Sequence, residues 1–230
     1  KMISKELKKK VAILFFLGAS QALIGWYMVK SGLINIPAVS HYRLALHLVF
    51  AFILMGYSLW VSLGIGYGNR KIANIPKYIK YIIILILLQI CLGAFTAGSN
   101  AGKYYNTFPM MDGSILPPEG LLYSFDFFHR NNIGNIQFSH RLFAWTILFI
   151  SIPYIYKRIK KNNKDNKNNS VIIFGCSLGI QFLLGVLTII YFNNWNKIVL
   201  GIIHQLGATI LFLSTISMAY FNTDVKNRNN

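Results

Sequence analysis

Three histidines occupy equivalent positions in long apolar stretches of this chain. His47, His140 and His204 each lie about five to seven residues inside such a stretch, counted from the same side. In an α-helix, this places them roughly 8–10 Å below the boundary of the stretch. Imidazole is a common axial ligand of heme iron, and helical bundles build such sites from side chains on facing helices. The pattern predicts heme ligation; the alternative is that each imidazole forms a hydrogen bond that joins two helices.

Arginines and small residues next to the histidines fit a heme. Arg43 lies one turn before His47, and Arg141 directly follows His140. Guanidinium groups form paired hydrogen bonds with carboxylates, so both arginines are candidates for binding heme propionates. The alternative is that both arginine side chains extend to the lipid phosphates at the membrane surface. Small residues that leave room for a flat macrocycle lie about one turn from the histidines: Ala51, Ala144, Gly201 and Ala208.

Acidic residues are absent from the apolar stretches. All six lie outside them: Glu6, Asp112, Glu119, Asp126, Asp165 and Asp224. Because a proton-coupled transporter usually carries an intramembrane carboxylate, this distribution disfavours a transporter. The remaining histidines, His41 and His129, fall at the edge of a stretch and in a connecting segment, where we expect surface positions.

The apolar stretches themselves predict the fold class. Of the 230 residues, 54% are hydrophobic and only 13% are charged. A membrane-spanning helix needs about 20 apolar residues, and in lipid the backbone must form its hydrogen bonds within each segment. We therefore expect an all-α, polytopic membrane helical bundle with spans at about 11–29, 41–66, 80–97, 135–156, 171–191 and 197–220.

Basic residues are distributed unequally between the two sides of these spans. Only six of the 23 lie on the side where the three histidine-bearing spans begin: Lys30, Arg43, Lys103, Arg130, Arg141 and Lys197. The positive-inside rule then places both ends of the chain and the Lys-rich connections in the cytoplasm. The basic residues are explained by topology and by the lipid bilayer as partner, and we expect no binding to nucleic acid.

The six spans form three outgoing and returning pairs that share a repeat. Each outgoing span carries Gln-x-x-x-Gly, and each returning span carries one of the three histidines near its start. The repeat comprises Gln21 and Gly25, Gln89 and Gly93, and Gln181 and Gly185. Small residues allow membrane helices to approach closely, and we assign that role to the glycines.

The long connection at about 98–134, on the side of the histidines, contains many aromatic residues. Loops of this length are usually functional or disordered. Two interpretations remain open: an ordered cap packed on the outer surface, or an aromatic belt at the membrane interface.

Several runs of the sequence resemble the heme A synthase family. They are the segments at 25–33 (GWYMVKSGL), 39–48 (VSHYRLALHL), 101–113 (AGKYYNTFPMMDG), 138–144 (FSHRLFA) and 204–208 (HQLGA). They occur in the family's order across nearly the whole chain. The likeness is closest to the bacterial and mitochondrial branch that lacks paired cysteines in its outer loops, which implies a bacterial inner (plasma) membrane protein.

The resemblance implies an enzyme with two pseudo-symmetric four-helix halves. Family members oxidise the C8 methyl group of heme O to the formyl group of heme A, which cytochrome oxidase uses. Partners would include an electron donor, heme O synthase and cytochrome oxidase assembly. It further implies that His140 and His204 ligate a heme b cofactor, with Arg141 beside it. His47, with Arg43, would face the substrate heme O.

The chain departs from the family pattern in one respect. Eight helices are expected and six are present, and the first hairpin, with its Glu-x-x-His-Arg element, is missing. No catalytic residue can therefore be assigned, and we expect a fragment, or a split or decayed gene product. On this interpretation 1–70 is the second half of the N-terminal bundle and 71–230 is the complete C-terminal bundle. A b-type cytochrome for electron transfer, or a heme-binding protein without turnover, is the alternative function.

Overall fold

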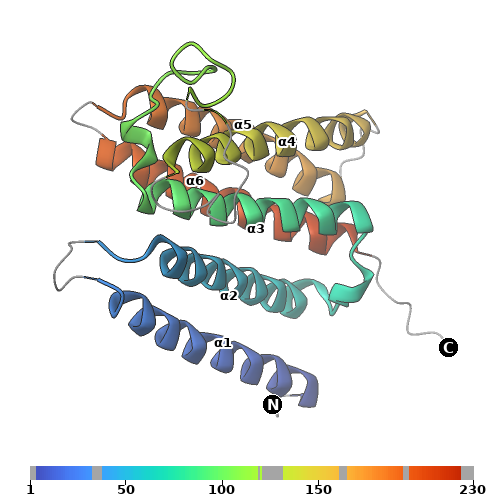
Figure 1. Cartoon of the computed structure of the whole chain (residues 1–230). Helices are drawn as coiled ribbons and strands as arrows, with labels where there is room; N and C mark the ends of the chain where they lie inside the picture. The colour runs from blue at the N-terminus through green and yellow to red at the C-terminus, as the bar shows by residue number, and fades with distance from the viewer. Residues whose placement is uncertain are drawn as a thin grey trace.

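The computed structural model is an all-α protein (Figure 1). It describes residues 4–32, 38–118, 120, 132–160, 165–193 and 197–223. The long helices are α1 (Lys5–Val29), α2 (His41–Tyr67), α3 (Lys77–Gly98), α4 (Ile133–Ile159), α5 (Asn166–Ile190) and α6 (Lys197–Asn222). Short 3₁₀ helices, η1 (Ile72–Asn74) and η2 (Ala101–Lys103), lie in two connections. Each long helix is long and apolar enough to cross a membrane, which confirms the predicted fold class.

Polar residues at the boundaries explain where two of these helices begin. The Ser4 hydroxyl accepts a hydrogen bond from the backbone N–H of Leu7 (3.2 Å), and the Asp165 carboxylate accepts one from that of Asn168 (2.7 Å). Such N-cap residues satisfy N–H groups that have no partner within the helix. The helices α1 and α5 consequently extend beyond their apolar segments.

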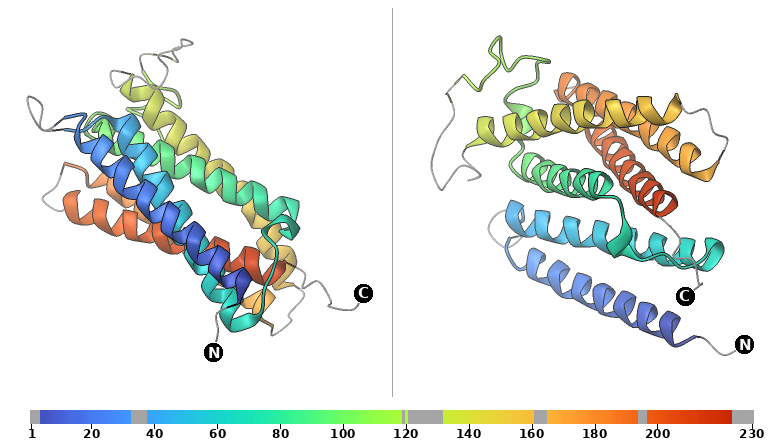
Figure 2. Two further views of the ribbon diagram at one scale, coloured as in Figure 1. Left: turned by 90° about the horizontal axis from the view of Figure 1, so that it is seen from below. Right: turned by 90° about the vertical axis from the view of Figure 1, so that its right-hand side faces the viewer.

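Four of the helices form a closed ring. Helix α3 packs against α4 and α6, and α5 packs against the same two helices. Helices α4 and α6 therefore occupy opposite corners. Helix α2 packs on the outside of this ring against α3 and α6, and α1 packs mainly against α2 (Figures 1 and 2). The division of the chain into two bundles at residue 70 remains a prediction.

The core lies where α3 faces α2 and α6. Ile79, Ile82 and Ile86 are spaced by three and four residues, so they share one face of α3. All three are buried, and they belong to one apolar cluster with Phe52 of α2 and Phe212 of α6. Burial of this shared face joins the outer hairpin to the ring.

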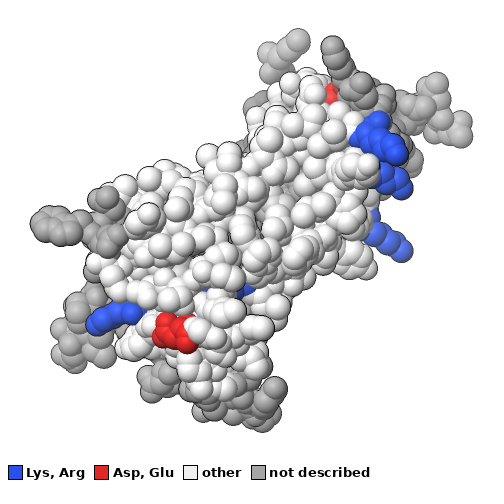
Figure 3. All heavy atoms as spheres, turned by 90° about the horizontal axis from the view of Figure 1, so that it is seen from above, with Lys and Arg blue, Asp and Glu red and all other residues white. Residues whose placement is uncertain are grey.

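The surface has the character expected of a membrane protein. Large apolar side chains are exposed along the helices, including Leu183 (62% exposed) and Leu206 (58%). In Figure 3, charged side chains gather near the two ends of the visible face and leave a broad uncharged band between them. Together with the six apolar helices of the described chain, this pattern identifies a multi-pass membrane protein.

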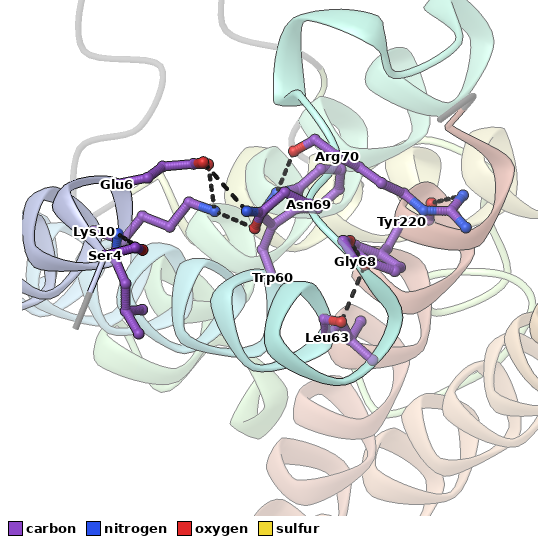
Figure 4. Close-up of polar contacts among 10 residues, drawn as sticks. Ser4, Glu6, Lys10, Trp60, Leu63, Gly68, Asn69, Arg70 and Tyr220 are labelled. Atoms are coloured by element: carbon purple, nitrogen blue, oxygen red, sulfur yellow. Dashed lines mark hydrogen bonds and ion pairs between the residues drawn. The ribbon is translucent and has the colours of Figure 1, made fainter. Parts of the chain in front are cut away.

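We call the end where α1, α3 and α5 begin the basic end, and the other the outer end. At the basic end, three polar side chains tie α1 to the α2–α3 connection (Figure 4). Lys10 Nζ lies 3.0 Å from a Glu6 carboxylate oxygen and donates to Asn69 Oδ1 (2.7 Å). Asn69 Nδ2 in turn donates to Glu6 (3.2 Å).

The same connection also holds the end of α6 through Arg70 (Figure 4). Its Nη1 donates to the backbone carbonyls of Tyr220 (2.9 Å), Phe221 (3.2 Å) and Thr223. Its guanidinium also lies 4.8 Å from the centre of the Tyr220 ring. The last carbonyls of a helix lack partners within it and favour a nearby cation. Arg70 therefore fixes α6 to the helices that precede it.

At the outer end, the connection after α3 folds back onto the ring. Phe108 stacks on Trp145 of α4 at 6.1 Å between ring centres, and its edge meets Phe182 of α5 at 6.2 Å. Gly102 in η2 approaches Phe192 so closely that a Cβ atom there would lie 2.6 Å from the ring. These contacts support the ordered-cap interpretation for residues 101–111, although Tyr104 itself is exposed.

Arg141 holds this part of the outer connection. It is 7% exposed, and its Nη1 donates to the carbonyls of Thr107 (2.9 Å) and Met110 (3.2 Å). Its Nη2 donates to the carbonyl of Tyr105 (2.9 Å) and to Gln137 Oε1 (3.3 Å). One guanidinium therefore satisfies backbone carbonyls spread over six residues of the loop.

We predict that Arg141→Lys loosens this loop. An ammonium group cannot serve carbonyls that two guanidinium nitrogens reach from different directions, and each hydrogen bond to a charged group contributes about 1.5–3 kcal/mol. Backbone amides between residues 105 and 111 should exchange hydrogen at least about tenfold faster, measured by mass spectrometry. Arg158→Lys, at the basic end, is the control and should leave this segment unchanged. Equal exchange in Arg141→Lys and the unaltered chain would refute the assignment.

Candidate functional site

The three histidines lie at similar depths in α2, α4 and α6. His47 is six residues from the start of α2, and His140 and His204 are each seven residues from the starts of α4 and α6. These positions are about 9–11 Å along the helix axes from the outer end. His140 and His204 lie on α4 and α6, which occupy opposite corners of the ring. Shared ligation of one iron by these two remains a prediction.

Each imidazole lies against the glycine of its own hairpin. A Cβ atom added to Gly25 would be 3.0 Å from Cε1 of His47. The corresponding distance is 3.2 Å for both Gly93 with His140 and Gly185 with His204. The glycines do allow close approach, as the sequence predicted, and the group that approaches is the histidine ring. In each repeat, the glycine therefore leaves a gap on one helix, and the imidazole of the next helix fills it.

In the first two hairpins, the repeated glutamine binds the histidine's backbone. Gln21 Nε2 donates to the carbonyl of His47 at 3.0 Å, and Gln89 Nε2 donates to that of His140 at 3.0 Å. Gln21 Nε2 also lies 3.4 Å from Nε2 of the His47 ring. Sequence reasoning used these glutamines only as markers of the repeat and missed this role.

The third hairpin differs because its glutamine contacts the ring most closely. Gln181 Nε2 lies 3.1 Å from His204 Nδ1 and 3.5 Å from His204 Nε2. In all three hairpins the glutamine Oε1 atom is buried and has no hydrogen-bond partner. The signal that could have identified the glutamines was their fixed spacing of four residues from the glycines.

Two of the three histidine rings have a nitrogen without a hydrogen-bond partner. Nδ1 of His47 and Nδ1 of His140 are buried without a hydrogen bond. A buried polar atom without a partner is costly, and neutral imidazole is a common metal ligand. Unused ring nitrogens, glycine gaps and a pair of histidines on opposite helices fit a heme held by two imidazoles.

The predicted arginines lie near the outer end but bind protein groups. Arg43 Nη1 donates to the carbonyl of Tyr27 (2.9 Å), and its guanidinium lies 3.8 Å from the centre of that ring. Both Nη atoms of Arg141 bind the outer connection and Gln137, whereas its Nε is buried without a partner. Propionate binding by either arginine stays a prediction.

A surface position for His41 is wrong. The residue is 5% exposed, and its ring meets the edge of Phe95 at 5.5 Å between ring centres. The reason is Gly98, where a Cβ atom would lie 2.7 Å from the His41 Cβ, so the start of α2 packs directly on the end of α3. His129 and Arg130 lie outside the described residues.

The acidic residues that the structure describes lie away from this site. Glu6 is in the first turn of α1, Asp165 caps α5, and Asp112 is in the outer connection. Within the described segments, no group of three or more His, Cys, Asp or Glu side chains could hold a metal ion. The histidine pair therefore remains the strongest candidate site.

Comparison with known proteins identifies the family of this chain. The family described as "Cytochrome oxidase assembly protein" (COX15-CtaA) matches residues 1–216. The heme A synthase of Flavobacterium psychrophilum is 39% identical over 221 residues, which cover 94% of this chain and 64% of that protein. The heme A synthase of Wolbachia pipientis wMel is 40% identical over 222 residues, covering 93% and 60%.

The chain thus spans less than two thirds of the length of these relatives. No solved structure matches it. The family match extends from the first residue into α6 and includes all three Gln, Gly and His units. On this basis, the chain belongs to the COX15-CtaA family of cytochrome oxidase assembly proteins.

Proposed function

We propose that this chain is the heme b-binding part of a heme A synthase, together with half of its substrate site. The complete enzyme would oxidise the C8 methyl group of heme O to the formyl group of heme A. Similar chains of the same family, named heme A synthase, support this activity. The observation that carries the proposal is the pair of matched histidine units on α4 and α6, at opposite corners of one helical ring.

His140 and His204 would ligate heme b through their ring nitrogens. Gly93 and Gly185 leave space for the two imidazoles, which come from helices at opposite corners of the ring. The bound heme supplies a one-electron redox centre. The buried, unpartnered Nε of Arg141 is the guanidinium nitrogen left to meet a propionate, since both Nη atoms hold the outer connection.

His47 would face heme O, with Arg43 nearer the outer end. The same Gln and Gly unit positions this histidine, which supports a related role. The resemblance assigns a second histidine and the acidic residue to a Glu-x-x-His-Arg element, and this sequence contains no such element. We therefore assign no catalytic carboxylate among the residues of this chain.

We further propose that the basic end faces the cytoplasm of a bacterium, with both ends of the chain on that side of the inner membrane. The basic residues around Lys10, Arg70 and Arg158 support this orientation through the positive-inside rule. The heme sites then lie near the outer face. An electron donor, heme O synthase and the cytochrome oxidase assembly machinery are the expected partners.

One observation favours a second function, that of a b-type cytochrome without substrate turnover. The histidine pair is present on α4 and α6, whereas the only acidic residue in the described membrane helices is Glu6, in the first turn of α1. Such a pair is sufficient for electron transfer. Formation of heme A distinguishes the two functions.

We predict that His140→Ala or His204→Ala removes the heme absorbance of the purified full chain. Each substitution deletes one of the two proposed axial ligands. Absorption spectra of the dithionite-reduced protein provide the measurement. His41→Gln, a histidine that packs outside the proposed site, should retain the heme. Wild-type heme content in both alanine variants would show that the ligand assignment is wrong.

We also predict that this chain alone forms no heme A in a host that makes heme O but lacks its own synthase. A chimaera that adds the part of the Flavobacterium psychrophilum relative not matched by this chain should form heme A. Chromatography of the extracted hemes provides the measurement. Heme A from the chain alone would show that no further element is needed. A chimaera that binds heme b but yields no heme A would favour the cytochrome.

A further inference from the structure

We propose that the side of the helical ring between α4 and α5 is the entrance through which heme passes from the lipid bilayer to His140 and His204. The segment 105–110 of the outer connection, which we call the gate, closes this entrance, and its opening limits the rate of heme exchange. The inference rests on the proposed function, because heme is the group that must pass. It goes beyond that function by assigning a route to the site.

Helices or histidines close the other three sides of the ring. Between α3 and α4, the imidazole of His140 fills the gap at Gly93. Between α5 and α6, the imidazole of His204 fills the gap at Gly185. The side between α3 and α6 is covered by α2, which packs against both helices. Among the described helices, none packs over the side between α4 and α5, so the outer connection provides its cover.

The gate covers this side with an aromatic ring. Phe108 stacks on Trp145 of α4 at 6.1 Å between ring centres, and its edge meets Phe182 of α5 at 6.2 Å. Trp145 and Phe182 also meet each other at 4.7 Å, so Phe108 lies where the two helices touch. Figure 1 shows the outer connection (green) lying over α5 near its outer end. Trp145 and Phe182 are about 18 Å and 12 Å along their helix axes from that end, so the gate reaches at least the depth of the histidines.

A loop at membrane depth needs protein donors for its carbonyl groups, because lipid offers none. Two side chains of α4 are the donors here. Arg141 donates to the carbonyls of Tyr105 (2.9 Å) and Thr107 (2.9 Å), and Gln137 also donates to that of Tyr105 (2.9 Å). Gln137, Arg141 and Trp145 are spaced by four residues and therefore share one face of α4. Side-chain contacts of this kind can open while the helices keep their own hydrogen bonds.

Phe108→Ala should open the gate, because it removes both aromatic contacts. We expect hemin to enter the full chain from phosphatidylcholine vesicles, and to leave it for excess apomyoglobin, about 5–100-fold faster. The dissociation constant should stay unchanged, because the gate makes the same contacts with and without heme, so both rates rise by one factor. Stopped-flow absorbance of the heme band measures both rates.

Phe149→Ala is the matched control. Phe149 stacks on the same Trp145 ring at 5.5 Å, but it belongs to α4 and is 63% exposed. This variant should exchange hemin at the rate of the unaltered chain. In Phe108→Ala, backbone amides of 105–110 should also exchange hydrogen faster by mass spectrometry, with helix content intact by circular dichroism. Faster amide exchange together with faster hemin exchange supports the proposal.

Unchanged hemin rates in Phe108→Ala would overturn the inference, whether or not the amides of the gate exchange faster. Faster hemin exit with weaker binding would also overturn it, because Phe108 would then stabilise bound heme instead of closing a route. Phe192→Ala tests passage at the outer end, where Phe192 meets Gly102. Faster hemin exchange in that variant, but not in Phe108→Ala, would place the entrance there and refute the gate.

The ligand assignment fails separately. If His204→Ala retains hemin, the proposed heme site is wrong, and the entrance falls with it. If His204→Ala loses hemin and Phe108→Ala exchanges hemin as the unaltered chain does, the heme site stands and only the gate is refuted.

Discussion

An imidazole between membrane helices requires both space and polar partners, because a buried polar group without them destabilises the structure. This protein meets the requirement in the same way in each hairpin. A glycine on the outgoing helix leaves a gap for the ring, and a glutamine one turn away binds the returning helix or the ring itself. The spacing of four residues places both groups on one face of the helix. The helix pairs are therefore built around their histidines.

The rest of the fold keeps these units in register with one another. The ring of α3, α4, α5 and α6 places two of them on opposite helices, and the apolar face of α3 joins the third to the ring. Arg70 fixes the basic end by binding the last carbonyls of α6, and Arg141 fixes the outer end by binding the loop carbonyls. Both arginines connect segments that are distant in sequence, so the packing near the histidines depends on contacts at both ends of the membrane helices.

Much of this arrangement could be predicted because membrane helices are encoded locally. Apolar length determined the six helices of the described chain, although α5 begins at Asn166, five residues before the predicted span, where Asp165 caps it. The repeat identified the histidines and glycines, since spacing along a helix determines which residues share a face. The burial of His41 and the loop-binding role of Arg141 could not be predicted. Each depends on how two distant backbone segments meet, which no local pattern specifies.

Ligation of one iron by His140 and His204 is the central claim. Electron–nuclear double resonance of the hemin-loaded chain, with histidine labelled with ¹⁵N, measures it directly. The account predicts low-spin ferric heme with two histidine nitrogens bound to the iron. A high-spin spectrum, or a single coordinated histidine nitrogen in the unaltered chain, would contradict it.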